Sequence, residues 1–91
     1  TSQSRGIDEG VSKAAFQLYR DGRVDDALSI VNDHLSKNPD DIEVVFLRGL
    51  IFLKDHKFEN AVDDLARIES PAGRWYLALS YVGLKDYAEA K

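Results

Sequence analysis

The stretch DGRVDDAL at residues 21–28 decides how this chain folds, because its pattern returns later in the sequence. The stretch DHKFENAV at residues 55–62 repeats the pattern, and LKDYAEA at residues 84–90 repeats it once more. In each copy a turn signal precedes an apolar residue and, three residues later, an alanine on the same helix face. The first two copies are 34 residues apart, and a fixed period of this length is typical of proteins built from stacked helical units.

Between the turns, apolar residues recur at steps of three and four, which is the spacing of one helix face. Short polar connections, Asn38-Pro39 among them, separate these apolar segments, and the residue before a proline disfavours the helical conformation. The predicted helices span about residues 8–20, 24–37, 42–53 and 58–68, then residue 71 to a turn at residues 84–86, with residues 87–91 as the opening of a sixth helix.

Helices joined by such short connections pack as antiparallel hairpins. We therefore predict an all-α fold, with a polar N-terminal tail at residues 1–7 and a single domain at residues 8–91. The domain is expected to contain hairpins over about residues 8–38, 39–69 and 70–91, the last of them truncated. The expected N-caps are Asp8, Asp40 or Asp41, and Ser70.

The composition limits what the protein does. Hydrophobic residues make up 44% of the 91 residues and charged residues 31%, which is the balance of a folded domain. The formal net charge of −4 argues against a nucleic-acid partner, since phosphate binding requires clustered Lys and Arg. No apolar run is long enough to insert into a membrane, and no signal peptide is recognisable, so the compartment stays open. The chain holds no cysteine and no methionine, and the latter indicates processing or excision from a longer chain.

The period and the residues at fixed places within it resemble the tetratricopeptide repeat (TPR) family. The matching residues are Ala15, Gly49 and Ala78 in the first helices, Gly22 in the turn, Val24, Phe58 and Tyr87 after the turns, Ala27, Ala61 and Ala90 in the second helices, and Pro39 at the close. The resemblance implies antiparallel helix-hairpin repeats stacked as a short right-handed solenoid, in which the small residues let paired helices approach closely. Two residues depart from the family: His34 stands where a small residue is usual, and Arg48 where Leu is preferred. Arg48 is expected either to pair with an acid such as Asp64 or Glu43, or to snorkel to the surface.

In this family the first helices of successive hairpins line a concave face on which peptides bind. Projected onto this sequence, the resemblance implies a strongly apolar groove with charges at its two rims. The expected rim charges are Arg20 and Lys54 at one end and Glu9 and Glu43 at the other. The expected groove residues are Phe16, Tyr19, Phe46, Leu50, Leu53, Trp75, Leu79 and Val82, with Ser12 beside them.

Such a groove points to a protein–protein interaction module, an adaptor, scaffold or chaperone-like holder that binds a short apolar or amphipathic peptide. The alternative is a structural or oligomerisation segment of a larger repeat protein, with no peptide ligand of its own. In that case the chain's own helices or a second copy would cover the apolar face, because large exposed apolar patches are uncommon on monomers. We expect the truncated C-terminal hairpin either to self-associate or, in a longer protein, to pack against further repeats.

Catalysis is not expected from this sequence, nor is a cofactor or a bound metal. No nucleophile motif, phosphate loop or dinucleotide fingerprint occurs. The adjacent acids at residues 25–26 and 63–64 diverge, since consecutive helix positions point about 100° apart. The two histidines, His34 and His56, are too few and too far apart in sequence to ligate zinc. They are interpreted as a helix-packing residue and a turn residue.

Overall fold

The computed structural model describes the backbone of residues 2–90 and the side chains of residues 10–86. Within residues 2–90 the chain is all-helical and contains no strand, so the predicted all-α class is confirmed. The helices are α1 (Ser2–Arg20), α2 (Val24–Lys37), α3 (Ile42–Lys54), α4 (Phe58–Leu65) and α5 (Pro71–Ala90).

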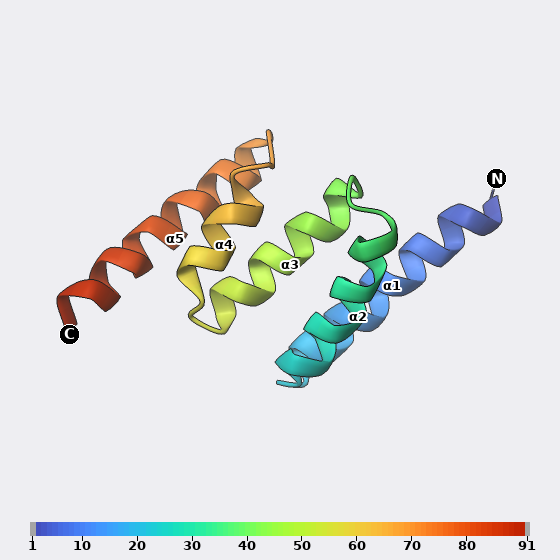
Figure 1. The fold of residues 1–91 in the computed structure, drawn as a ribbon, viewed down its shortest axis with the longest axis horizontal. Helices are drawn as coiled ribbons and strands as arrows, with labels where there is room; N and C mark the ends of the chain where they lie inside the picture. Colours follow the sequence, from blue (N-terminus) through green and yellow to red (C-terminus); the bar gives the residue numbers. More distant parts are fainter. Residues whose placement is uncertain (1, 91) are drawn as a thin grey trace.

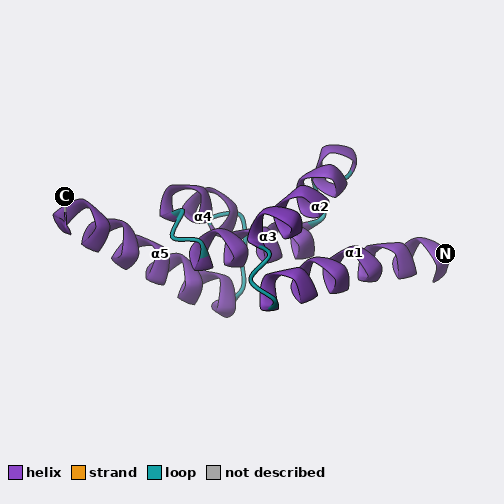
Figure 2. Ribbon diagram, turned by 90° about the horizontal axis from the view of Figure 1, so that it is seen from below, coloured by secondary structure: helices purple, strands orange, loops and turns teal. Residues whose placement is uncertain are grey.

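The helices follow one another along an elongated molecule with extents of 48 × 27 × 20 Å (Figure 1). α1 packs against α2 and α3 against α4, while α5 packs on the outer side of α4. α3 also contacts α1, α2 and α5, so it is the central helix. Figure 2 shows α2 and α4 on one side of the molecule and α1 and α5 on the other, with α3 between them. In Figure 1, α1, α3 and α5 run in the same direction, and this fixes which of their ends are neighbours.

Three predicted boundaries are wrong. α4 ends at Leu65 and not near residue 68, although Ile68 is still buried in the core. α1 begins at Ser2, so residues 2–7 are not a separate tail and Asp8 is not an N-cap. α5 continues through residues 84–86 to Ala90, so the predicted turn and the opening of a sixth helix are absent. Polarity alone does not stop a helix, and neither Leu84 nor Lys85 is a helix breaker. The third copy of the repeated stretch has Lys85 where the first two have Gly22 and His56, the residues that reverse the chain.

The hydrophobic core lies among α1, α2, α3 and α4, and the small residues of the repeated pattern decide how closely these helices approach. Ala15, Ala27 and Ala61 are fully buried. A Cβ atom on Gly49 would lie 2.8 Å from Leu65 Cδ2, so α3 and α4 are in contact through the glycine backbone. Ala78, by contrast, is exposed, because no second helix covers that side of α5 within the described residues. Larger residues complete the core, namely Leu28, Val31, Leu35, Val44, Val45, Ile51, Leu65 and Ile68.

Of the predicted N-cap side chains, one caps its helix and another forms a different contact. The Ser70 hydroxyl accepts a hydrogen bond from the Gly73 amide at 3.1 Å, which confirms Ser70 as the N-cap of α5. Asp41 precedes α3 but forms no side-chain cap. Its carboxylate instead lies 2.8 Å from Nε2 of His34, a buried residue of α2. His34 therefore packs between helices, as interpreted from the sequence, and it also fixes the start of α3 relative to α2.

The two hairpin turns share one backbone geometry that depends on a residue with positive φ. Gly22 has φ of 81° and His56 has φ of 59°. In each turn, the backbone amides of the positive-φ residue and of the residue after it donate hydrogen bonds to carbonyl oxygens in the last turn of the preceding helix. The Arg23 amide donates to Leu18 O at 2.8 Å, and the Lys57 amide donates to Phe52 O at 2.9 Å. This is the Schellman arrangement, in which glycine is the usual left-handed residue. His56 adopts the same conformation with a Cβ atom, which costs about 1–2 kcal/mol.

We expect His56→Gly to stabilise the protein by about 0.5–1 kcal/mol, because the left-handed conformation is then free of the Cβ penalty. The entropy that glycine adds to the unfolded chain offsets part of the gain. His56→Ala is the matched control, since it removes the imidazole ring beside Phe58 but keeps a Cβ atom. Urea unfolding followed by circular dichroism measures both variants. If His56→Ala is as stable as His56→Gly, backbone strain at this turn is not the cause.

Candidate functional site

An apolar groove of about 450 Å³ lies between α1 and α3. Phe16 from α1 faces Phe46, Leu47 and Leu50 from α3 across it. Phe16 is 47% exposed, although a phenylalanine of a small domain is commonly buried. Ser12, Lys13 and Glu43 complete the lining. Most of the wall area is therefore carbon, with a few polar groups at the edge, which is the usual character of a binding cleft.

Helix periodicity explains why these side chains converge. Ser12 and Phe16 are four residues apart on α1, and so are Phe46 and Leu50 on α3, so each pair lies on one helix face. The other faces of α1 and α3 are engaged in the core through Ala15, Val45 and Gly49. Direct contact between α1 and α3 places the two remaining faces side by side. The groove is thus a consequence of packing α3 against both α4 and the α1–α2 hairpin.

A cluster of aromatic rings and cations adjoins Phe16 at the end where α1 and α3 terminate. The Phe16 and Tyr19 rings are stacked with centroids 6.0 Å apart. Arg20 Cζ lies 6.0 Å from the centroid of the Phe16 ring, and Lys54 Nζ lies 5.2 Å from the centroid of the Tyr19 ring. These distances suit cation–π contacts. The two predicted rim cations therefore lie together beside the groove.

The opposite end of the groove is where α3 begins, and the predicted acid Glu43 lines it there. Lys13 and Ser12 of α1 line the groove as well. The other predicted acid, Glu9, falls outside the residues whose side chains the structure describes. The groove accordingly has Glu43 at one end and Arg20 with Lys54 at the other.

The structure brings together three of the eight predicted groove residues, Phe16, Phe46 and Leu50, in the groove itself. Tyr19 and Leu53 are partly buried against the core and lie beside it. Trp75, Leu79 and Val82 are exposed on α5 and do not line it. Lys13 and Leu47 line the groove but were not among the predicted site residues. Leu47 follows Phe46 and Lys13 follows Ser12. A prediction that included the sequence neighbours of each groove residue would therefore have found both.

The exposed face of α5 is the second apolar surface of the described chain. Trp75 is 63% exposed and Val82 57% exposed, and Leu79 and Tyr81 accompany them. The side of α5 toward α4 contains small residues, since a Cβ atom on Gly83 would lie 2.3 Å from Phe58 Cε1. The α5 helix also meets α3 through the Phe46 and Tyr76 rings, whose centroids are 6.0 Å apart. This contact connects α5 to the edge of the groove.

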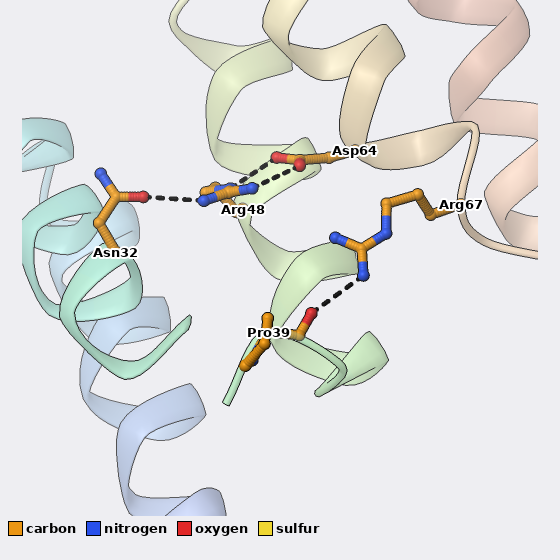
Figure 3. A network of polar contacts seen from close by, with 5 residues as sticks. All are labelled: Asn32, Pro39, Arg48, Asp64 and Arg67. Carbon is orange, nitrogen blue, oxygen red and sulfur yellow. Dashed lines mark hydrogen bonds and ion pairs between the residues drawn. The ribbon is translucent and has the colours of Figure 1, made fainter. Parts of the chain in front are cut away.

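A polar network joins the two hairpins on the other side of the molecule (Figure 3). The Arg48 guanidinium on α3 donates to both carboxylate oxygens of Asp64 on α4, at 2.8 and 2.7 Å, and to Asn32 Oδ1 on α2 at 3.0 Å. Arg67 donates to the carbonyl oxygen of Pro39 at 2.9 Å. Of the two acids considered from the sequence, Asp64 is therefore the partner of Arg48.

The Arg48–Asp64 pair is structural, since both of its charges are mutually satisfied. The hydrogen bond to Asp64 raises the pKa of Arg48 above its ordinary value, burial acts in the opposite direction, and the charge of Asp64 adds to the increase. A raised pKa means that this contribution to stability is fully present at neutral pH and is lost only as the pH rises through the raised pKa. No buried side-chain nitrogen or oxygen among the described residues lacks a hydrogen-bond partner.

Among the described residues, no group of three His, Cys, Asp or Glu side chains is arranged to hold a metal ion. No helix in the described part of the chain has the length and apolar content that crossing a bilayer requires. Comparisons with family models, with curated proteins and with solved structures find no significant match to this chain.

Proposed function

We propose that the protein is a protein–protein interaction module that binds an apolar or amphipathic peptide segment in the groove between α1 and α3. The observation that carries the proposal is the groove itself, an open apolar surface in which Phe16 remains 47% exposed. Leaving such a side chain in water has a cost that a bound apolar segment would remove. Aromatic and aliphatic walls with a polar rim suit an amphipathic helix bound along its apolar face.

The repeated pattern supports a TPR-like reading of this groove. Phe16, Leu50 and Leu79 occupy equivalent places in the first helices of the three units, and so do Ser12, Phe46 and Trp75. The first helices α1, α3 and α5 run in the same direction (Figure 1). A short solenoid of stacked hairpins, in which first helices line one face, accounts for both facts. Because proteins with this architecture have many unrelated functions, it suggests a mode of binding but does not identify a partner.

We expect Phe16→Glu to weaken peptide binding by about tenfold or more while the fold is retained, because a charge replaces the exposed ring that a ligand would cover. A suitable probe is a fluorescein-labelled peptide of about 15 residues, with leucine along one helix face and glutamine elsewhere. Fluorescence anisotropy measures its affinity. Ile42→Glu is the matched control, because Ile42 is also an exposed apolar residue, at 43%, but does not line the groove. Equal affinity for both variants would argue against binding in the groove.

The alternative function, a structural or oligomerisation segment without a peptide ligand, is favoured by the exposed face of α5. Its apolar residues, Trp75 and Val82 above all, are not covered by the described chain. Light scattering coupled to size-exclusion chromatography distinguishes the two functions. A dimer that persists in Phe16→Glu but dissociates in Trp75→Glu would support association through α5 alone. A monomer that binds the peptide probe would support the module.

A further inference from the structure

We propose that the partner of the groove is α5 of a second copy of this chain, so that two molecules form a closed dimer. The inference rests on the proposed function, because it requires the groove to bind an amphipathic helix, and it identifies that helix. Two apolar surfaces of the described chain are uncovered, the groove between α1 and α3 and the outer face of α5. Placing the outer face of α5 of one molecule in the groove of another would cover both surfaces.

The outer face of α5 has the pattern that an apolar groove recognises in a helix. Trp75, Leu79, Val82 and Asp86 follow one another at steps of four, three and four residues, so their side chains form one stripe. All four are exposed. Another side of α5 packs inward: Gly73 and Ser80 are buried, and Gly83 lies against Phe58 of α4. The stripe can therefore enter a partner's groove without disturbing the packing of α5 in its own molecule.

The charges at the two ends of the groove complement those of the stripe when the partner α5 lies parallel to α1 and α3. Arg20 and Lys54 lie together where α1 and α3 end, and neither forms an ion pair with a side chain of residues 10–86. Asp86 is the acid at the C-terminal end of the stripe. A partner α5 that lies parallel to α1 and α3 places this acid beside the two cations. The reverse orientation would move it toward Glu43, which lines the other end.

Most of the remaining charges near this contact do not oppose the parallel orientation. Lys85 precedes Asp86 and projects about 100° away from it around the helix. Asp55, at the end of α3, forms an ion pair with Lys57, with 3.5 Å between Lys57 Nζ and Asp55 Oδ2. Asp21 is exposed in the turn after Arg20 and would repel Asp86, and Lys13 lines the groove where it would repel Arg74. Arg74, at the start of the stripe, would approach the Glu43 end.

The shape of the molecule allows the contact to occur twice. The groove belongs to the first half of the chain and α5 lies at the opposite end of the long axis (Figure 1). A two-fold axis parallel to the helices that brings α5 into a partner's groove also brings the partner's α5 into this one. Such an isologous arrangement is closed and leaves neither surface free for further addition.

The first test is the oligomeric state of the complete chain, measured by light scattering and sedimentation up to about 1 mM. The wild type is expected to dimerise, and Phe16→Glu and Trp75→Glu are each expected to weaken self-association by about tenfold or more. Ile42→Glu is the control and should leave it unchanged. An equimolar mixture of Phe16→Glu and Trp75→Glu should associate more strongly than either alone, because the mixed pair retains one intact contact. Circular dichroism confirms that each variant is folded.

A charge exchange tests the orientation. Asp86→Lys is expected to weaken the dimer by about three- to tenfold, the range of an ion pair at a solvent-exposed rim. Combining it with Arg20→Glu and Lys54→Glu should restore association, because the attraction is re-formed with opposite signs. Failure of the combined variant to recover would overturn the parallel orientation.

The outcomes separate this inference from the proposed function. A wild type that stays monomeric at about 1 mM overturns the dimer. If it still binds the leucine–glutamine peptide, and Phe16→Glu abolishes that binding, the groove serves a different protein and the proposed function stands. A dimer that Phe16→Glu leaves intact overturns the inference as well, since α5 would not be in the groove. A monomer that does not bind the peptide contradicts both proposals.

Discussion

Arg48→Leu is expected to lower the free energy of unfolding by about 3 kcal/mol, although leucine suits an apolar helix better than arginine does. The reason is that Asp64, the partner of Arg48, remains buried after the change. Asp64 is only 4% exposed, and Arg48 supplies the two hydrogen bonds that compensate its burial. Without the guanidinium, a charged carboxylate is left buried and unpaired. Urea unfolding, with midpoint and slope fitted together, measures the loss.

A double-mutant cycle assigns this loss to the pair. Asp64→Ala is expected to cost less than Arg48→Leu, because the Arg48 side chain is 23% exposed and can turn toward water. The variant with both changes should be more stable than the sum of the single losses predicts, by about 2 kcal/mol. Asn32→Ala is the control, since it removes only the exposed third contact of Arg48. Simple additivity of the two changes would mean that the pair contributes little to stability.

Gly49→Val is expected to destabilise the protein by about 2–3 kcal/mol, because it forces α3 away from Leu65 of α4, with which Gly49 is in close contact. Even the first added carbon would lie 2.8 Å from both Cγ and Cδ2 of Leu65, a fully buried residue. The added branches leave no room for a small adjustment of that side chain. The same unfolding measurement applies, and loss of the groove is a second expected consequence, since Phe46 and Leu50 lie on α3.

Gly10→Val provides the comparison at a helical glycine without close tertiary neighbours among residues 10–86. No atom from another part of this described region lies within 4 Å of a Cβ atom built on Gly10. We expect a change of about 0.5 kcal/mol or less there, because valine is a better helix former than glycine. If both variants lose the same stability, the close approach of α3 and α4 at Gly49 would not be the cause.

The candidate site was predictable from sequence only in part. Phe16, Phe46 and Leu50 could be placed on one surface because helical spacing and the 34-residue period define equivalent faces. The position of Trp75, Leu79 and Val82 depended on how α5 is oriented on α4, and they lie outside the groove. That orientation follows from contacts such as Gly73 with Ile68 and Gly83 with Phe58, which no local pattern specifies.

The helical class, the extents of α2 and α3 to within a residue, and the turn at Gly22 follow from the sequence, because they depend on local spacing and local backbone energy. The pairing of Arg48 with Asp64 and the confinement of the groove to α1 and α3 follow from how the helices pack. So does the continuation of α5 to Ala90 as one helix. A third turn would need a left-handed residue at Lys85, and that cost is offset only when the next helix packs back onto the chain.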